Sequence, residues 1–470
     1  MNSQTHTSPA GAMRSSPSTG SELPSAVSRR KFLTTGALAT AGLTILPSGT
    51  LFGRGANSKL NIALIGAHGR GSQLYQGIRS ENVVALCDVN ASNLAQAKEA
   101  FPHAKTYVDW RKCLDQKDID AVVCATPDAT HAFIATWAMN RGYHVYMEKP
   151  LGNCVYEARM VRDCYLKNRH KLATQHGTQN HALHNNQRVV ELIRRGAIGE
   201  LRHVHTWGNR THSVTDYHPA EGTQPDHLNW DLWLGPSPER PYSPRYFGGK
   251  PGTNCLRWNM FRDYGSWQVG DMGSHVMDFA WNAIDADRPT KISATGDDFN
   301  PSVCPSRLRA VFDMPANDWR GEIRLVWHQG GLKPNNPHDS VNLGKIGHGM
   351  MYVGTRGILV SDFRTRLIIP SGADANMTYY DAPSSEEDLL PETGNFMEQW
   401  MRAAKGDLKT NCDFDYAGRM IETLMLGLVA HEAGQELEYD ATAGRITNMA
   451  AANSTTYFKR TYRPGWELNG

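Results

Sequence analysis

Asp271 and His275 are four residues apart, so their side chains share one face if this stretch of the chain is helical. Imidazole is the side chain best suited to accept a proton near neutral pH, and the Asp271 carboxylate could orient that ring or bind a hydroxyl. A third reactive group, Lys149, comes directly after the apolar run His144–Met147 and Glu148. An ammonium group at a strand end can hydrogen-bond a hydroxyl that becomes a carbonyl. We predict that these three residues are catalytic.

Each of these residues also has a simpler structural explanation. Lys149 could be a surface lysine that closes a strand, while Asp271 and His275 could be a helix cap and a buried, hydrogen-bonded histidine. Their joint occurrence, in this order and after a nucleotide-binding unit, favours a site over three separate coincidences.

The turn after the first apolar run is rich in glycine, and the predicted cofactor contacts there are Gly66, His68, Gly69, Arg70 and Gly71. Glycine permits a tight turn and lets backbone N–H groups approach a pyrophosphate at the start of a helix. The match to the G-x-G-x-x-G pattern is imperfect, because His68 takes the place of the second glycine.

A carboxylate ends the second apolar run. Asp88 follows Gly66 by 22 residues, which is the place expected for an acid that bonds the ribose hydroxyls of a dinucleotide. A carboxylate there would repel the 2′-phosphate of NADP, so NAD is the predicted cofactor and NADP is disfavoured. A Rossmann-like sheet without a cofactor is the alternative, and the motif together with its context favours dinucleotide binding.

Residues after the later strands face the same crevice, since parallel strands end at one edge of a sheet. The candidate cofactor contacts there are Thr126, Pro127, His131, Glu148 and Lys149, and we expect His131 to start a helix rather than to catalyse. Amide and indole groups are candidate substrate contacts, although burial in the core explains the indoles equally well. These candidates are Gln175, Gln179, Asn180, Trp230 and Trp267.

The histidine and cysteine spacings do not predict a metal site. His181 and His184 are three residues apart, but no carboxylate or cysteine completes a recognisable ligand set. None of the eight cysteines forms a C-x-x-C pair, and the spacing identifies no disulfide. Cys87 and Cys124 lie inside apolar runs, so we expect them to be buried thiols.

From residue 58 to about residue 180, strands alternate with helices. Near-continuous apolar strands in such an alternation predict a parallel sheet that is covered on both faces, here a Rossmann NAD-binding domain. The predicted strands are Asn61–Ile65, Val83–Cys87, Ala121–Ala125, His144–Met147 and Leu172–Thr174. The predicted helices are Gly71–Arg79, Ala91–Ala100, His131–Arg141 and Tyr156–Asn168.

The pattern changes after about residue 200, where helical periodicity mostly disappears until Asn395–Ala404 and Tyr416–Gly434. Residues 181–470 are therefore predicted to form an α+β domain with a large, mostly antiparallel open sheet. Long loops at Thr211–Arg257 and Gly330–Gly349 interrupt it. Its predicted strands are Leu201–Trp207, Arg307–Asp313, Gly321–Trp327, Met351–Val353 and Ile358–Ser361.

Residues 1–57 have the composition of an export signal and leader. The pair Arg29-Arg30 precedes Phe32-Leu33 and the apolar run Gly36–Leu46, which resembles a twin-arginine (Tat) signal and is too short for a membrane span. We therefore expect the Tat translocase as a partner and a periplasmic or otherwise exported protein. No clear Ala-x-Ala cleavage site follows, so an uncleaved signal would leave a membrane tether.

Composition excludes several classes of protein. Hydrophobic residues make up 40% and charged residues 20%, which does not fit a disordered chain. The net charge is +2, and residues 1–57 hold five basic residues and one acidic residue, so the rest carries 44 basic against 46 acidic residues, or −2. Without a basic surplus, we expect no nucleic-acid partner.

A strand that ends in Glu148-Lys149-Pro150 beside a Rossmann unit resembles the Gfo/Idh/MocA oxidoreductase family (glucose-fructose oxidoreductase, inositol dehydrogenase and relatives). The segment Gly270–Asp278 agrees, because the family places a catalytic Asp four residues before a catalytic His. The resemblance covers about residues 59–470. The segments Asn229–Pro236 and Gly354–Gly357 look like the exported, Tat-signal-bearing branch.

The resemblance implies that His275 accepts the substrate proton as hydride moves to the nicotinamide. It also implies that residues 181–470 form a substrate-binding and oligomerisation domain, and that a homodimer or homotetramer forms through the C-terminal sheet. The expected substrate is a sugar, a glycoside or a cyclic polyol. Since free NAD is scarce outside the cytoplasm, an exported enzyme is expected to retain its cofactor tightly and to recycle it on a second substrate.

Two alternatives use the same fold. Some relatives are redox-neutral glycoside hydrolases, in which transient oxidation of a sugar hydroxyl permits elimination and hydration. They carry a different residue at the position of Lys149, so the Glu-Lys-Pro sequence favours a dehydrogenase. A non-catalytic sugar-binding relative is the other alternative, and the presence of Lys149, Asp271 and His275 argues against it.

Overall fold

The computed structural model describes residues 58–371 and 394–468, and the predicted Tat signal lies outside them. The N-terminal part is a six-stranded sheet in the order β3-β2-β1-β4-β5-β6, and its listed neighbours pair in parallel. This order is that of the doubly wound dinucleotide-binding fold. The strands are β1 (Asn61–Ile65), β2 (Asn82–Cys87), β3 (Lys105–Tyr107), β4 (Ala121–Cys124), β5 (His144–Met147) and β6 (Thr174–His176).

The central strands explain why this sheet forms. All residues of β4 and β5 are buried, as are four of the five residues of β1, which is the pattern of a parallel sheet covered on both faces. The predicted strand Leu172–Thr174 is displaced: β6 is Thr174–His176, because its ladder with β5 extends to Met147. The polar edge strand β3 was not predicted, since two of its three residues are exposed.

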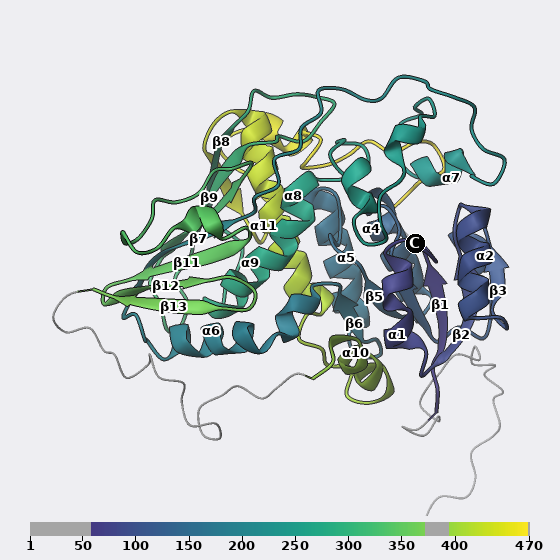
Figure 1. Ribbon diagram of the computed structural model, residues 1–470, viewed down its shortest axis with the longest axis horizontal. Coiled ribbons are helices and arrows are strands. Elements are labelled where there is room, and N and C mark those ends of the chain that lie inside the picture. Colours follow the sequence, from purple (N-terminus) through teal and green to yellow (C-terminus); the bar gives the residue numbers. More distant parts are fainter. Residues whose placement is uncertain (1–57, 372–393, 469–470) are drawn as a thin grey trace, which may run out of the picture. The chain divides into compact units, whose positions relative to one another are not determined.

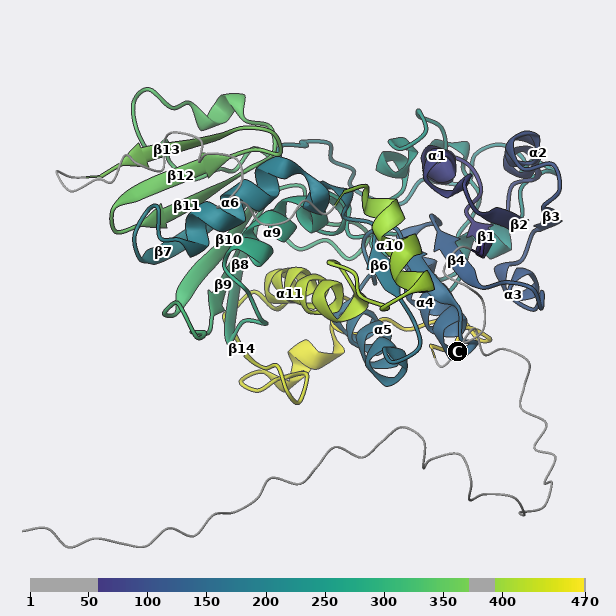
Figure 2. The same ribbon diagram turned by 90° about the horizontal axis from the view of Figure 1, so that it is seen from below.

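Different helices cover the two faces of this sheet (Figure 2). One face packs against α1 (Tyr75–Ile78), α2 (Ala91–Ala100) and α10 (Phe396–Lys405). The other face packs against α3 (Trp110–Cys113), α4 (His131–Asn140) and α5 (Val155–Asn168). The helix predicted over Gly71–Arg79 is instead a 3₁₀ turn, η1 (Gly71–Leu74), followed by the single turn of α1.

The second sheet has nine strands in the order β13-β12-β11-β7-β10-β9-β8-β14-β15 (Figure 1). Only β7 and β10 pair in parallel among its described strands, so the prediction of a mostly antiparallel sheet is confirmed. The strands are β7 (Leu201–Trp207), β8 (Lys291–Gly296), β9 (Leu308–Met314), β10 (Ile323–Gln329), β11 (Gly349–Gly354), β12 (Gly357–Ser361), β13 (Arg366–Pro370), β14 (Leu437–Asp440) and β15 (Arg445–Ile446).

Helices α6 (His184–Arg194), α9 (Met272–Ala283) and α11 (Phe414–Ala433) pack on one face of this second sheet or on one another. Helix α11 also packs against α5, so it joins the two sheets through one core. The expectation that helical periodicity disappears after residue 200 missed α9. All but one of its twelve residues are buried, and a helix that is buried all round has no polar face to give a period.

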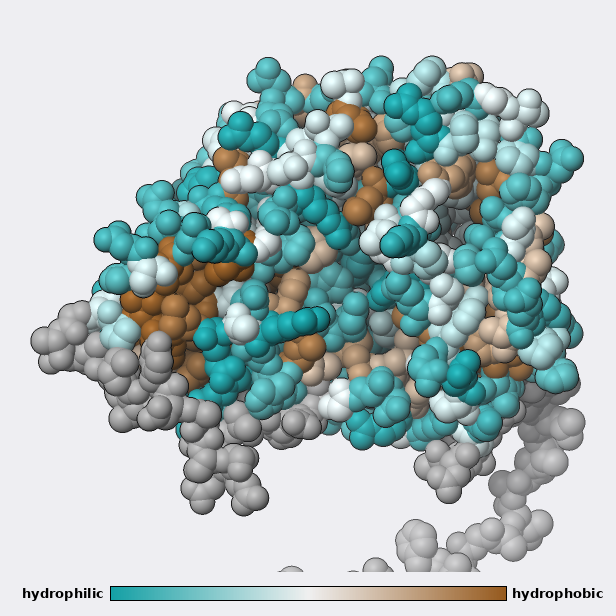
Figure 3. Space-filling view, viewed as in Figure 1, coloured by the Kyte–Doolittle hydropathy of each residue, from teal (hydrophilic) through white to brown (hydrophobic). Residues whose placement is uncertain are grey.

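The other face of the nine-stranded sheet carries an apolar cluster beside Trp207. Hydrophobic side chains gather there over the region of β11, β12 and β13 (Figure 3). Within the described residues, no helix combines the length and apolar character that a bilayer crossing requires. All eight cysteines are free thiols, and Cys87 and Cys124 are buried as predicted.

Candidate active site

A cleft lies at the carboxyl ends of β1, β2, β4 and β5, where the strand order reverses between β1 and β4. Ligands of open α/β sheets bind at this switch point. The long loop after β7 forms the opposite wall, and the cleft holds about 1200 Å³ of space including its open mouth. The residues that this loop contributes include Leu228, Trp233, Tyr246, Phe247, Asn254 and Trp258.

The glycine-rich turn has a shape that only glycine allows. Gly66 has φ +76°, and a Cβ there would lie 2.5 Å from the carbonyl oxygen of Ala125. A Cβ on Gly71 would lie 2.0 Å from the carbonyl oxygen of Gly66. Glycine at these two positions therefore lets the turn pack tightly against itself and against the loop after β4. Gly66 lines the cleft, whereas the predicted contacts Gly69 and Gly71 are not among its lining residues.

Asp88 ends β2 and lines the same cleft. Its Oδ1 accepts hydrogen bonds from the backbone N–H of Asn90 at 2.9 Å and from Nδ2 of Asn93 at 3.1 Å. Burial raises the pKa of this carboxyl, although these donors oppose the shift. The position and orientation of Asp88 fit a contact with ribose hydroxyls.

Arg70 and Glu148 connect the glycine turn to the end of β5. Their side chains form an ion pair with Arg70 Nη2 and Glu148 Oε1 2.8 Å apart. Both residues line the cleft, as do the predicted contacts His68, Thr126 and Pro127.

His131 begins α4, as expected. Its Nδ1 lies 2.7 Å from the carbonyl oxygen of Pro150 and its Nε2 lies 2.9 Å from that of Thr126. Burial lowers the pKa of His131, and a neutral ring can donate to only one of these oxygens at a time. The ring therefore holds two loops of the cleft together.

The three predicted catalytic residues lie near one another: Lys149 lines the cleft, it contacts Asp271, and its charge acts on His275. Lys149 Nζ donates to Oδ1 of Asp271, and Arg210 Nη1 donates to its Oδ2, so two cations hold the carboxylate. Asp271 immediately precedes α9, and His275 lies one turn further along the same face.

His275 is placed to accept a proton. It is 6% exposed, and its Nδ1 is buried without a hydrogen-bond partner. Burial, reinforced by the positive charges of Lys149 and Arg70, holds the pKa of His275 well below its usual range. A neutral imidazole beside two cations can act as a base at physiological pH.

Several predicted substrate contacts lie elsewhere. Gln175 is fully buried and donates to the carbonyl oxygen of Phe396 and to Oε1 of Gln399, because its strand turns that side chain toward α10. Trp230 packs in an aromatic cluster, stacked on Trp233 with ring centroids 4.7 Å apart.

Trp267 is 1% exposed within the main core, since its chain segment lies under α9 rather than at the cleft. Gln179 and Asn180 are half-buried in η3 (Gln179–Ala182) and do not line the cleft. Gln175, Trp230 and Trp267 do not line the cleft, whose lining includes the tryptophans Trp110, Trp233 and Trp258. Their role as substrate contacts stays a prediction.

Sequence reasoning missed Arg210, Trp233 and Asp128. Arg210 and Trp233 belong to the long loop after β7. Trp233 lies in the segment Asn229–Pro236 that the family resemblance marked, whereas no local pattern distinguishes Arg210. Asp128 lies in the loop four residues after the end of β4, so its place near a strand end was the available signal.

Asp128 supports a prediction about stability. Burial raises the pKa of Asp128 to about 7 from 3.8, although the charge of Lys149 opposes this shift. Between these values the folded state binds more protons than the unfolded state, so the free energy of unfolding falls as pH rises. Asp128→Asn stays neutral, so its free energy of unfolding should not show this fall. The difference in free energy of unfolding between Asp128→Asn and the wild type should therefore grow, in favour of the variant, by about 2–3 kcal/mol from about pH 5 to about pH 8.5.

Denaturant unfolding of nucleotide-free protein at both pH values measures this gain. The exposed Asp226→Asn variant is the matched control and should track the wild type. A constant difference between Asp128→Asn and the wild type across this range would contradict the prediction.

Fold and cleft together define a dinucleotide-binding protein of the doubly wound class. A model described as "Oxidoreductase family, NAD-binding Rossmann fold" matches residues 60–176, and one described as "Oxidoreductase family, C-terminal alpha/beta domain" matches residues 204–312. The chain belongs to the Gfo/Idh/MocA family, and NAD is the cofactor of its Rossmann domain. The predicted family, fold class and cofactor are confirmed.

The alignments with curated relatives cover only part of this chain and part of each relative. A glycosyl hydrolase family 109 protein of Stenotrophomonas maltophilia is 31% identical over 195 residues, which are 38% of this chain and 41% of the relative. A 1-carboxy-3-chloro-3,4-dihydroxycyclohexa-1,5-diene dehydrogenase of Comamonas testosteroni is 30% identical over 160 residues, 33% of this chain and 38% of the relative. The chain thus spans about two fifths of the length of these relatives.

Solved structures share the fold. The WlbA dehydrogenase of Bordetella pertussis, in complex with NADH and UDP-GlcNAcA, superimposes with a TM-score of 0.57 at 14% identity. The match covers 81% of this chain and 99% of that chain.

Proposed function

We propose that the protein is an NAD-dependent oxidoreductase that acts on a hydroxyl of a sugar, a glycoside or a cyclic polyol. The observation that carries this proposal is the contact of Lys149 with Asp271, with His275 one helical turn away. The dehydrogenase of Comamonas testosteroni and the sugar-nucleotide complex of WlbA support an alcohol as the reacting group.

Different residues of the chain have different roles in the proposed reaction. Backbone groups of the glycine turn and the Asp88 carboxylate hold NAD, which when bound supplies a hydride acceptor. The Lys149 ammonium donates a hydrogen bond to the reacting hydroxyl oxygen, and Asp271 orients that ammonium. The neutral imidazole of His275 takes the hydroxyl proton, so the oxygen can become a carbonyl as the C–H bond breaks.

We further propose that the protein is exported by the Tat translocase with its cofactor bound, and that the exported molecule is a homodimer or homotetramer. The apolar cluster on the nine-stranded sheet offers a surface for such an assembly. Because free NAD is scarce outside the cytoplasm, the proposed enzyme recycles its own cofactor on a second substrate. A membrane tether would follow if the signal stays uncleaved.

The proposed cofactor retention can be measured directly. We expect purified protein, once denatured, to release about one NAD(H) per chain, as judged by mass spectrometry of the supernatant. Empty protein that binds added NAD would point to an ordinary exchanging dehydrogenase. Empty protein that binds neither NAD nor NADP would overturn the proposed function.

A second candidate is a redox-neutral glycoside hydrolase, which the similarity to glycosyl hydrolase family 109 proteins favours. The same fold and cofactor would serve it, because a transiently formed carbonyl acidifies the neighbouring C–H bond. Lys149 is the departure from the residue that such hydrolases carry at this position. Incubation with a panel of glycosides separates the two activities. Release of a free sugar without net NADH identifies the hydrolase, whereas a keto-sugar product identifies the dehydrogenase.

A further inference from the structure

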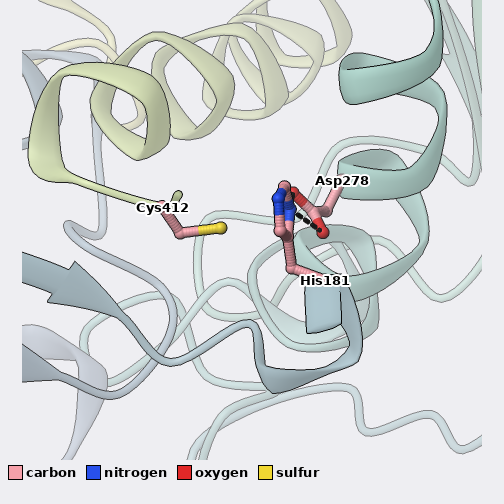
Figure 4. A group of neighbouring side chains, drawn as sticks. All are labelled: His181, Asp278 and Cys412. Carbon is pink, nitrogen blue, oxygen red and sulfur yellow. Dashed lines mark hydrogen bonds and ion pairs between the residues drawn. The ribbon is translucent and has the colours of Figure 1, made fainter. Parts of the chain in front are cut away.

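A buried cluster away from the cleft brings together an imidazole, a carboxylate and a thiol. His181 comes from η3, Asp278 from α9 and Cys412 from the turn just before α11. The three side chains offer one ligand atom each, and these atoms lie within 4.8 Å of one another. Figure 4 shows the thiol and the carboxylate on opposite sides of the His181 ring, both directed toward it.

Hydrogen bonds already orient this group. His181 Nδ1 lies 3.0 Å from both carboxylate oxygens of Asp278, and the Tyr416 hydroxyl donates to Oδ1 of Asp278 at 2.7 Å. The Cys412 thiol contacts the imidazole as well. An outer donor that fixes a ligating carboxylate, as Tyr416 does here, is a regular feature of metal sites.

We infer that His181, Asp278 and Cys412 bind one zinc ion, or another divalent ion with affinity for sulfur. Nitrogen, oxygen and sulfur donors together suit zinc, whereas magnesium and calcium prefer oxygen alone. Two ligands of a tetrahedral zinc lie roughly 3.5 Å apart, so the imidazole and the carboxylate are already at suitable spacing. The thiol sulfur lies within 4.8 Å of the other two ligand atoms, and rotation of its side chain can bring it closer.

Charge and burial agree with this assignment. Asp278 and Cys412 are fully buried and His181 is 6% exposed. A carboxylate and a thiolate balance the charge of a divalent ion, so the occupied site would be neutral in the core. The Thr178 hydroxyl is fully buried and lies beside the Cys412 thiol.

The proposed ion would have a structural role that does not depend on the proposed function. It would link η3 after the Rossmann sheet to α9 and to the start of α11, three segments that are far apart in the sequence. Asp278 is three residues beyond His275 on α9, so the ion would hold the helix that carries the predicted base.

Elemental analysis of the full-length protein, purified without chelator and dialysed against excess zinc and then buffer, tests the inference. We expect about one zinc per chain in the wild type and less than about one tenth of that in Cys412→Ser. Cys164→Ser is the matched control, because Cys164 is also a buried thiol but contacts only Asn140, Asn168 and a backbone carbonyl. Zinc should be retained in this control.

Cobalt provides a readout that needs no variant, which matters if Cys412→Ser fails to fold. Cobalt bound by the unaltered chain should give the intense thiolate-to-metal absorption that oxygen and nitrogen ligands alone do not give. Wild-type protein that stays free of zinc, equal zinc in all three proteins, or bound cobalt without that absorption would each overturn the inference. In that case a hydrogen bond, without a metal ion, would join His181 to Asp278.

Discussion

His275→Asn should lower kcat for oxidation of the best substrate by a factor of about 10²–10⁴, because asparagine cannot accept the hydroxyl proton. NAD content should stay at the wild-type value, since His275 does not line the cofactor cleft. The measurement is the rate at which nicotinamide absorbance changes in a single turnover with a sugar or polyol chosen from a panel. His184→Asn, at an exposed histidine, is the matched control and should keep the wild-type rate.

The pH profile of kcat/KM distinguishes a catalytic His275 from a His275 that only stabilises the fold. Burial and neighbouring cations lower the pKa of His275 from 6.5, so the base loses its function only when pH falls below that lowered pKa. The acid limb of kcat/KM should therefore lie below pH 6.5 in the wild type. A variant that lost activity while the acid limb stayed unchanged would show that another group is the base.

Lys149→Met should lower kcat by about 10²–10³, the effect expected when one charged donor to the reacting oxygen is removed. The change also leaves Asp271 with Arg210 as its remaining cation partner among the contacts given above. Single-turnover rates and NAD content, measured on the same preparations, separate lost chemistry from lost cofactor.

Lys291→Met is the matched control, because Lys291 is a half-exposed residue of β8 whose nearest carboxylate oxygens are 3.6 Å and 3.8 Å away. This variant should react at the wild-type rate. A Lys149→Met enzyme with full activity would remove Lys149 from the proposed mechanism and would favour a role in strand closure.

The cofactor half of the site was predictable because it depends on local patterns. Gly66 and Asp88 each stand at the end of a buried strand, and parallel strands deliver their ends to one edge of the sheet. The i, i+4 spacing of Asp271 and His275 likewise needed only a helix, which α9 supplies.

Tertiary structure decided the contacts that join distant segments. Arg210 meets Asp271 across 61 residues, and Gln175 turns to α10 across 221 residues, and no local period encodes either pairing. The candidate metal cluster was also beyond prediction from local spacing. The carboxylate and thiol neighbours of His181 are 97 and 231 residues away in the sequence.

By itself, the sequence determined the Rossmann unit and NAD as its cofactor, and it predicted three candidate reactive groups, because strand hydrophobicity, glycine and short spacings act within a few residues. The structure alone decided which side chains surround those groups. Packing of helices and loops against two sheets sets such neighbours, and burial in that packing gives His275 and Asp128 their shifted pKa values.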